Sequence, residues 1–321
     1  MHLTLRDGKM FGYLAINKPQ GWTSRDVVNR IQGLIRPVKV GHTGTLDPLA
    51  TGVLLVAIGP ATRLVEFSHE ASKEYVGQFE LGHSSDTLDV EGNITELDAQ
   101  AVSKAELEES LDSWRGQIEQ IPPKFSAVNI NGRRAYDLAR DGKAFSIPTR
   151  SVTIHALELL DFNPKHYQLR IECSTGTYIR TLGSDIAKAL GTDAVMSQLT
   201  RTRVGRVYLE SCVELETLKS VTDVASAVQP ACELIYGMPI QTVDTGVVDQ
   251  IRNGVKLNAN QLGSELQNFA TPERFAAVDE THNLVGIMSL AQGHYRSLRV
   301  FQNTKDMTQP KSISAPQSPE S

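Results

Sequence analysis

The feature that most constrains this chain is a run of twelve residues, Gly41–Gly52. It places a single acid, Asp47, among three glycines, three threonines, one histidine and one proline. The apolar segment Val53–Ile58 follows at once and predicts a buried strand. Glycine permits positive φ and a close approach of the backbone to a ligand, and Pro48 fixes φ directly after the acid. The run therefore predicts a loop that holds Asp47 in one orientation at the head of a strand.

Two other interpretations of this run stand beside a functional site. A lone aspartate in a loop rich in glycine and threonine is more often a turn or capping residue. A phosphate-binding loop is the second alternative, but the GxxxxGK[ST] pattern is absent because Val53, not lysine, follows Gly52. Composition alone leaves the turn and the site as alternatives.

The length and composition of the chain limit its class. Its 321 residues suffice for two domains. No apolar stretch approaches about 18 residues, so no membrane span is expected, and the first residues lack the pattern of a secretory signal. Cys173, Cys212 and Cys232 form no CxxC pair and predict neither a disulfide framework nor a zinc site. We expect a cytoplasmic protein.

The charge distribution is more informative than the net charge of −5, which argues against a nucleic-acid partner. Residues 96–112 hold six acids and one base, and their local net charge equals the net charge of the whole chain. Residues 124–150 hold six bases and two acids, and Arg201, Arg203 and Arg206 form a second basic cluster. Phosphate contacts depend on local potential. The pattern permits RNA binding, although each cluster alone also fits a solvated face.

Periodicity and capping residues predict the elements of the first two thirds of the chain. Strands are expected at 11–17, 53–58, 74–82, 151–160 and 167–173, and helices after Thr23 or Ser24, after Ser103 with Glu106 as its capping box, and from 179 to the stop at Gly191. The first strand runs into a tight turn that holds Lys18. The polar loop 83–92 resembles a calcium loop only superficially, because it lacks the D-x-[DN]-x-[DN]-G order, and we expect no metal there.

Arg180 lies in the first turn of the helix that begins at 179. A cation there opposes the helix dipole by up to about 1 kcal/mol, so a compensating acid is expected. Asp47 is one candidate, because an arginine within about 4–6 Å holds an aspartate ionised by lowering its pKa. The alternative partner is Asp185, on the same helix.

The sequence changes character near residue 237. Short strand-like runs at 254–257, 274–278, 284–288 and 295–300 predict a β-rich barrel of about sixty residues. Past Asn303 the composition predicts a disordered tail. We therefore expect domains at 1–236 and 237–303 and a tail at 304–321.

The run Gly41–Gly52 resembles the signature of the TruB family of tRNA pseudouridine synthases. Further landmarks of the family follow in order up to about residue 206. They are Lys18–Gly21 with Thr23–Ser24, Lys73–Tyr75, Gly82 with Asp86–Asp89, Pro122–Ala127, Tyr136 with Ala139–Arg140, Ser174–Arg180 and Leu199–Gly205. Phe125, Asn129 and Thr200 depart from the residues usual in the family, which affects individual RNA contacts rather than the chemistry.

The resemblance implies an α+β pseudouridine synthase fold, a bent and mostly antiparallel sheet flanked by helices, with a small C-terminal PUA-like β-barrel that binds RNA. The implied activity is isomerisation of uridine 55 in the T-loop of tRNA to pseudouridine. The implied partner is the T-stem-loop of tRNA, with no metal, no cofactor and no membrane, and we expect a monomer.

The resemblance also implies the central site residues. Asp47 would be the nucleophile or base that acts on the sugar, and Arg180 would keep it ionised and oriented. Hydrolysis of a glycosidic bond uses two carboxylates, whereas detaching and reattaching a base needs one. We therefore expect Asp47 to have no second acid at its side. The target base must also be flipped out of the T-loop.

Five further residues receive roles by resemblance. Tyr75 would stack on the freed uracil, worth roughly 1–3 kcal/mol, and help to remove the C5 proton. His42 would fill the space left by the flipped base, Tyr178 and Leu199 would line the uracil pocket, and Lys18 would contact the substrate. Plain core packing is the alternative for Tyr75, Tyr178 and Leu199.

Two competing functions stay open at this stage. The first is a non-catalytic RNA chaperone or binding module that keeps the fold, which the joint presence of Asp47, Tyr75 and Arg180 disfavours. The second keeps the chemistry but acts on ribosomal or messenger RNA.

Overall fold

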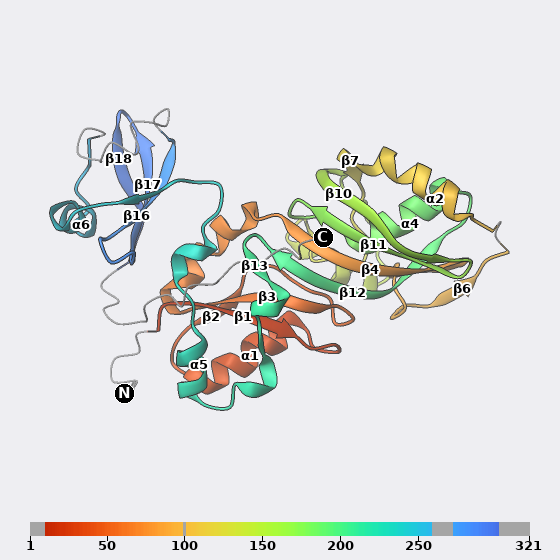
Figure 1. The fold of residues 1–321 in the computed structure, drawn as a ribbon, viewed down its shortest axis with the longest axis horizontal. Helices are drawn as coiled ribbons and strands as arrows, with labels where there is room; N and C mark the ends of the chain where they lie inside the picture. The colour runs from red at the N-terminus through yellow and green to blue at the C-terminus, as the bar shows by residue number, and fades with distance from the viewer. Residues whose placement is uncertain (1–9, 99–100, 259–271, 302–321) are drawn as a thin grey trace, which may run out of the picture.

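The computed structural model describes residues 10–98, 101–258 and 272–301. Within them, ten strands form one large sheet that runs through the molecule (Figure 1). Across the sheet the order is β14 (Val213–Glu214), β1 (Gly12–Lys18), β3 (Thr51–Ile58), β12 (Ala194–Val204), β4 (Lys73–Leu81), β11 (His166–Cys173), β10 (Arg150–Asn163) and β7 (Gly116–Gln120), with β2 (Val40–His42) beside β3 and β13 (Val207–Tyr208) beside β12. Only the pairs β1–β14 and β12–β3 are parallel. The predicted α+β class with a largely antiparallel sheet is confirmed.

The burial pattern of the strands follows from their sequences. Alternate residues of a strand face opposite sides of a sheet, and β4 alternates between buried and partly buried positions along its length. The apolar strand β3 is buried at every position after Thr51, because layers cover both of its faces. The apolar side chains at even-numbered positions of β1 and β3 belong to one apolar cluster, and those at odd-numbered positions belong to a second.

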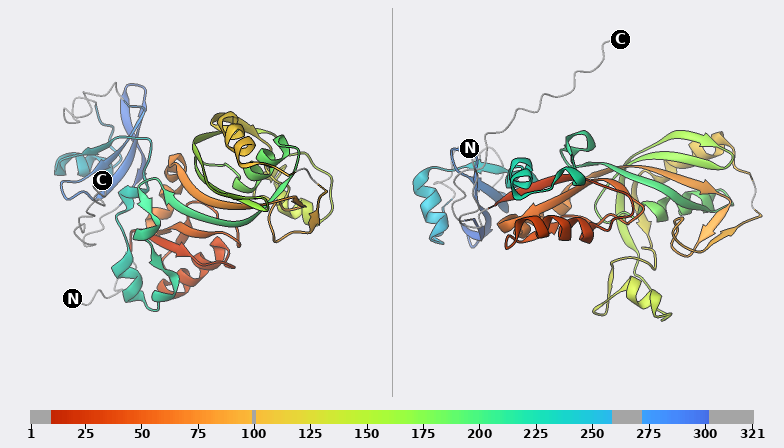
Figure 2. Two further views of the ribbon diagram at one scale, coloured as in Figure 1. Left: turned by 45° about the vertical axis from the view of Figure 1, so that its right-hand side comes forward. Right: turned by 90° about the horizontal axis from the view of Figure 1, so that it is seen from below.

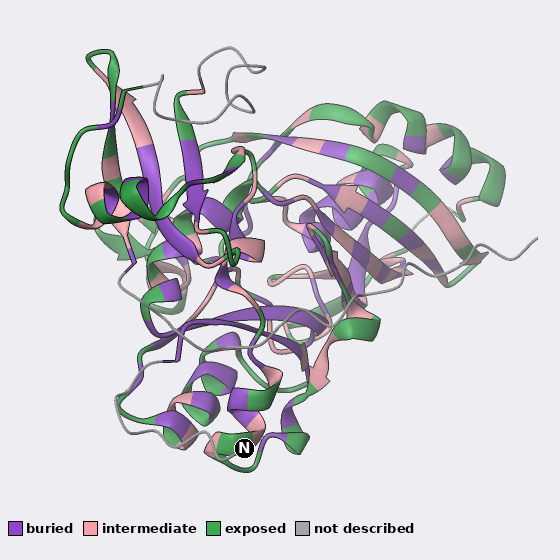
Figure 3. Ribbon diagram, turned by 60° about the vertical axis from the view of Figure 1, so that its left-hand side comes forward, coloured by how far each residue is buried: buried purple, intermediate pink, exposed green. Residues whose placement is uncertain are grey.

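Helices begin where the capping residues predicted them. Thr23 caps α1 (Ser24–Ile35) and forms a capping box with Asp26. The buried stripe of α1 joins the first apolar cluster. Figure 3 colours the buried residues of the chain purple. Ser103 and Glu106 form the predicted box at α2 (Lys104–Leu111). The helix α4 (Ile179–Ala189) ends at Gly191, whose φ is 80°. The remaining helices are α3 (Ala135–Arg140), α5 (Val221–Ala227) and α6 (Thr245–Arg252).

An arm projects from the sheet between β7 and β10 (Figure 2, right). It contains the small hairpin of β8 (Asn129–Ile130) and β9 (Arg133–Arg134), followed by α3. A second hairpin, β5 (His83–Ser85) with β6 (Ile94–Glu96), follows β4. Among the described residues, every helix is too short or too polar to cross a membrane.

The C-terminal part holds a four-stranded sheet in the order β15 (Ile240–Thr242), β16 (Arg274–Val278), β17 (Leu284–Ala291) and β18 (His294–Val300). The strands predicted at 274–278, 284–288 and 295–300 are confirmed. The strand predicted at 254–257 is wrong: the Gly254 and Val255 N–H groups donate to Ile251 and Gln250 and terminate α6. In the described residues the sheet is open and no closed barrel forms. Residues 259–271 and the predicted tail at 304–321 lie outside the described ranges.

The C-terminal sheet is packed onto the rest of the chain. Phe301 stacks on Phe11 with ring centroids 5.2 Å apart. Arg299 pairs with Glu66 at 2.8 Å, in the 3₁₀ segment η1 (Gly59–Glu70). Ala276 and other residues of the sheet belong to the second apolar cluster of the large sheet. One continuous core therefore joins the two parts.

Candidate active site

The loop between β2 and β3 is fixed by hydrogen bonds, as its sequence predicts. The buried Ser24, at the start of α1, accepts a hydrogen bond from the Leu46 N–H at 2.8 Å and donates one to the Leu46 carbonyl at 3.1 Å. The Ala50 N–H donates to the Asp47 carbonyl at 3.1 Å. The backbone is thus held on both sides of the aspartate. The Asp47 side chain itself keeps 36% of its surface exposed.

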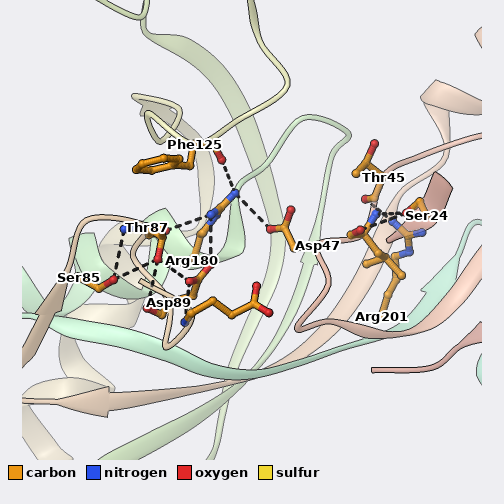
Figure 4. A network of polar contacts seen from close by, with 11 residues as sticks. Ser24, Thr45, Asp47, Ser85, Thr87, Asp89, Phe125, Arg180 and Arg201 are labelled. Carbon is orange, nitrogen blue, oxygen red and sulfur yellow. Dashed lines mark hydrogen bonds and ion pairs between the residues drawn. The ribbon is translucent and has the colours of Figure 1, made fainter. Parts of the chain in front are cut away.

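The predicted ion pair between Asp47 and Arg180 is present. Arg180 Nη2 lies 3.2 Å from Asp47 Oδ2, and the arginine side chain is only 7% exposed (Figure 4). Its Nη2 also donates to the Phe125 carbonyl at 2.8 Å, and its Nη1 donates to the Thr87 carbonyl at 3.1 Å. These carbonyls fix the plane of the guanidinium. The alternative partner, Asp185, forms no ion pair with Arg180 in the described residues.

A second carboxylate, which the sequence analysis missed, lies on the other branch of the same arginine. Asp89 Oδ2 is 3.2 Å from Arg180 Nη1, and the Asp89 side chain is 3% exposed. Asp89 Oδ1 accepts hydrogen bonds from the Thr87 hydroxyl at 2.5 Å and from the Glu91 N–H at 3.1 Å. The expectation that Asp47 has no second acid at its side is therefore wrong. Asp89 is buried and fully engaged, so it differs from the water-activating carboxylate of a hydrolase.

A third acid, Glu91, stands at the edge of the same group. Burial raises the pKa of Glu91, and the negative charges of Asp89 and Asp47 raise it further. A hydrogen bond from the Leu49 N–H acts in the opposite direction. The turn that follows β5 therefore carries two acids to the loop of Asp47. Its Asp-Thr-Leu-Asp-Val-Glu sequence was the available signal, but nothing in it indicates which loop it meets.

Tyr75 and Leu199 lie on the neighbouring central strands β4 and β12, and both are 7% exposed. Burial raises the pKa of Tyr75, whereas the nearby Arg201 guanidinium lowers it. Tyr178 caps α4, two residues before Arg180, and its backbone exchanges two hydrogen bonds with the Gln120 side chain at 2.8 and 3.1 Å. The sheet and the start of α4 thus bring the predicted residues into one region.

His42 and Lys18 both carry buried side-chain nitrogens at the loop. His42 Nδ1 is buried without a hydrogen-bond partner in the described part of the chain. Burial and two nearby arginines lower the pKa of His42, which favours the neutral imidazole. Lys18 is fully buried and donates to the carbonyls of Trp22, Pro19 and Pro48 at 2.6, 2.9 and 3.4 Å. In this structure Lys18 ties the loop to the turn after β1, and its predicted contact with the substrate stays a prediction.

The second basic cluster is also corrected by the structure. Arg201 is buried, and Arg203 forms an ion pair with Glu172 at 2.8 Å. Only Arg206 of the three is exposed. A cation that is buried or paired inside the protein is not available to bind a phosphate of RNA. In the described residues no group of three or more His, Cys, Asp or Glu side chains could hold a metal ion.

Comparisons with known proteins agree on one family. Residues 32–179 match the model for the TruB family pseudouridylate synthase N-terminal domain, and residues 180–233 match that for the tRNA pseudouridylate synthase B C-terminal domain. Both matches end before β15. The chain is 39% identical to tRNA pseudouridine synthase B of Geobacillus thermodenitrificans, covering 83% of this chain and 93% of the relative. It is 33% identical to the Clostridium kluyveri protein of the same name, covering 91% and 100%.

Solved structures share the fold. A crystal structure of a Cbf5-Nop10-Gar1 complex aligns with a TM-score of 0.68 at 26% identity, covering 87% of this chain and 78% of that chain. The structure of an H/ACA RNP bound to a substrate RNA containing 2′-deoxyuridine aligns with a TM-score of 0.69 at 23% identity, covering 92% and 86%.

Proposed function

The chain belongs to the TruB family of pseudouridine synthases and converts uridine in tRNA to pseudouridine, and we propose that its target is uridine 55 of the T-loop with Asp47 as the nucleophile. The observation that carries this proposal is the ion pair of Asp47 with a buried, fully anchored Arg180. Asp47 combines a fixed backbone with an exposed carboxylate. That combination suits a group that must meet a substrate in one geometry.

The chemistry assigns separate tasks to the charged groups. The reaction breaks the C1′–N1 bond of the uridine and makes a C1′–C5 bond, so the base must stay bound between the two steps. We assign the attack on the sugar to Asp47, and we assign the orientation of the Asp47 carboxylate to Arg180. Asp89, on the opposite branch of Arg180, keeps the guanidinium in place as a buried counter-ion.

The surrounding side chains suit a flipped base. We assign stacking on the uracil to Tyr75, with Tyr178 and Leu199 lining the same pocket. Tyr178 is the N-cap of the helix that carries Arg180, and the paired strands of Tyr75 and Leu199 adjoin the end of the loop of Asp47 through the pairing of β12 with β3. His42 would occupy the space that the base leaves. Its neutral, partly buried ring is compatible with stacking in RNA, because an uncharged imidazole is readily desolvated.

The test is to map pseudouridine in tRNA treated with the purified protein and with Asp47→Asn. We expect modification at uridine 55 by the wild type, none by Asp47→Asn, and similar affinity of both for tRNA. Asp185→Asn, on the helix of Arg180, serves as the matched control and should retain activity. Product formation by Asp47→Asn would refute the assignment. Binding without product by the wild type would favour the RNA chaperone, and product only in other RNAs would favour a synthase of ribosomal or messenger RNA.

We further propose that the C-terminal sheet is part of a PUA-like barrel that binds tRNA beyond the T-stem-loop. The exposed Arg296 on β18, a strand that carries no acid, supports this. Because the sheet shares a core with the rest of the chain, a charge reversal tests this better than truncation. Arg296→Glu should weaken binding of whole tRNA but not of an isolated T-stem-loop. Equal affinities of mutant and wild type for whole tRNA would contradict the proposal.

We also propose that the protein works in the cytoplasm as a monomer, without cofactor or metal. The proposal of a monomer is supported by the charged groups of the site, since Asp47, Asp89 and Arg180 all come from one chain.

A further inference from the structure

The largest buried side chain near the site has no part in the mechanism given above. Arg201, on β12, is 2% exposed. In the part of the chain that the structure describes, no carboxylate forms an ion pair with it. A buried charge without a counter-charge is strongly destabilising unless polar groups replace the lost water. The partners of Arg201 therefore indicate what its burial achieves.

Those partners are backbone carbonyls at both ends of the loop of Asp47. Arg201 Nε donates to the Val53 carbonyl at 2.7 Å, just after the loop. Its Nη1 and Nη2 lie 3.4 and 3.3 Å from the carbonyls of Thr45 and Gly44, shortly before Asp47. The planar guanidinium thus joins the two ends of the loop. In the view of Figure 4, Arg201 and Thr45 lie on the opposite side of Asp47 from Arg180.

The backbone of Arg201 is in contact with the same loop. Gly52 pairs with Arg201 in the parallel register of β3 and β12, and its φ is 98°. A Cβ atom at Gly52 would lie 2.2 Å from the Arg201 carbonyl oxygen. Both the main chain and the side chain of Arg201 therefore determine where the loop lies.

Arg201 also faces the aromatic ring assigned to the uracil. In the antiparallel register of β4 and β12, Arg201 stands directly opposite Tyr75, so their side chains share one face of the sheet. Burial raises the pKa of Tyr75, and the charge of Arg201 and a side-chain hydrogen bond from it lower that pKa. One guanidinium therefore hydrogen-bonds the loop that carries Asp47 and acts on the hydroxyl of Tyr75 across the paired strands.

We propose that Arg201 is a positioning residue for the isomerisation, which fixes the Tyr75 ring relative to the loop that carries Asp47. This inference rests on the roles proposed above for Asp47 and Tyr75. The nucleophile must reach the sugar while the ring holds the base, so an error in their separation affects every turnover. A misplacement of about 1 Å costs on the order of 100-fold in rate.

The test is a double-mutant cycle read as the single-turnover rate on a T-stem-loop at saturating enzyme. We expect Arg201→Met to slow isomerisation about 100-fold, with the affinity for the RNA changed less than about threefold. In the Tyr75→Phe background, the same substitution should cost less than about tenfold, because the link to the hydroxyl is already lost. Arg203→Met, on the same strand but paired with Glu172, is the matched control and should keep the wild-type rate.

Arg201→Lys covers the case in which Arg201→Met does not fold. Lysine keeps the charge but lacks the fork that spans several carbonyls, so we expect a rate between those of Arg201→Met and the wild type. A wild-type rate for Arg201→Lys, or equal rate losses from the Arg201 substitution in both Tyr75 backgrounds, would overturn the inference. Absence of product with the wild-type protein would overturn the proposed function as well, so the two failures are distinguishable.

Discussion

Replacing Asp89 by asparagine tests whether the buried acid supports both the fold and the reaction. At 3.2 Å from Arg180 Nη1, the attraction of two unit charges is about 5 kcal/mol at an effective dielectric constant of 20. Desolvation offsets part of it, and removing one partner of a buried pair typically costs 3–5 kcal/mol. Arg180 keeps Asp47 as a second partner, so we expect Asp89→Asn to lower the free energy of unfolding by about 3 kcal/mol.

The substitution should also slow the reaction. Among the described residues, Asp47 is then the one carboxylate paired with Arg180, and the guanidinium can shift toward it. We expect the single-turnover rate of isomerisation to fall about 100-fold. Urea unfolding followed by circular dichroism measures the first effect and pseudouridine formation the second. Asp86→Asn, in the same turn but exposed and hydrogen-bonded to Asn93, is the control. A stability loss below about 1 kcal/mol, or a wild-type rate, would refute the reasoning.

Two further predictions concern the packing beneath the loop. Burial, with the charge of Arg201, lowers the pKa of Lys73 from 10.5 to about 8. Between pH 8 and 10.5 the unfolded chain binds one more proton than the folded chain, so the free energy of unfolding of the wild type rises by about 3 kcal/mol across that window. Lys73→Met should therefore be more stable than the wild type at pH 7, and urea titrations should show that this advantage shrinks as the pH rises. A difference that does not change with pH would contradict this. Gly52→Ala should cost at least about 3 kcal/mol and abolish the activity, because its Cβ meets the Arg201 carbonyl, whereas Gly82→Ala, with positive φ but open space around it, should cost only about 1–2 kcal/mol. Equal losses for the two glycines in thermal unfolding would show that φ alone matters.

Much of the fold was predictable because local sequence determines it. The apolar run of β3, the cap at the start of α1, the capping box at Ser103 and the Gly191 stop of α4 are all local signals, and all are confirmed. The pair of Asp47 and Arg180 was predictable for a different reason. A cation at a helix start requires compensation, and a restrained acid was the available partner.

The buried cations were not predictable, because lysine and arginine are normally exposed. Lys18 and Arg201 are satisfied by backbone carbonyls whose positions depend on the whole fold. Asp89 was missed because nothing in the sequence of its turn indicates that the turn meets Arg180. The helix α6 was missed, and its end was taken for a strand, because Gly254 and Val255 give the same pattern in a strand and in a helix stop.

The buried cations also explain why the loop is rich in glycine and threonine. Lys18 and Arg201 contact carbonyls of the loop and of the turns beside it, and Lys73 Cε lies 3.9 Å from a Cβ position at Gly44. Carbonyls can converge on a buried cation only where the backbone is free to turn and approach closely, which small residues allow. In the described residues none of these three cations forms an ion pair with a carboxylate. The loop of Asp47 is therefore packed on buried, positively charged side chains. The glycine- and threonine-rich composition that first suggested a simple turn is what this packing requires.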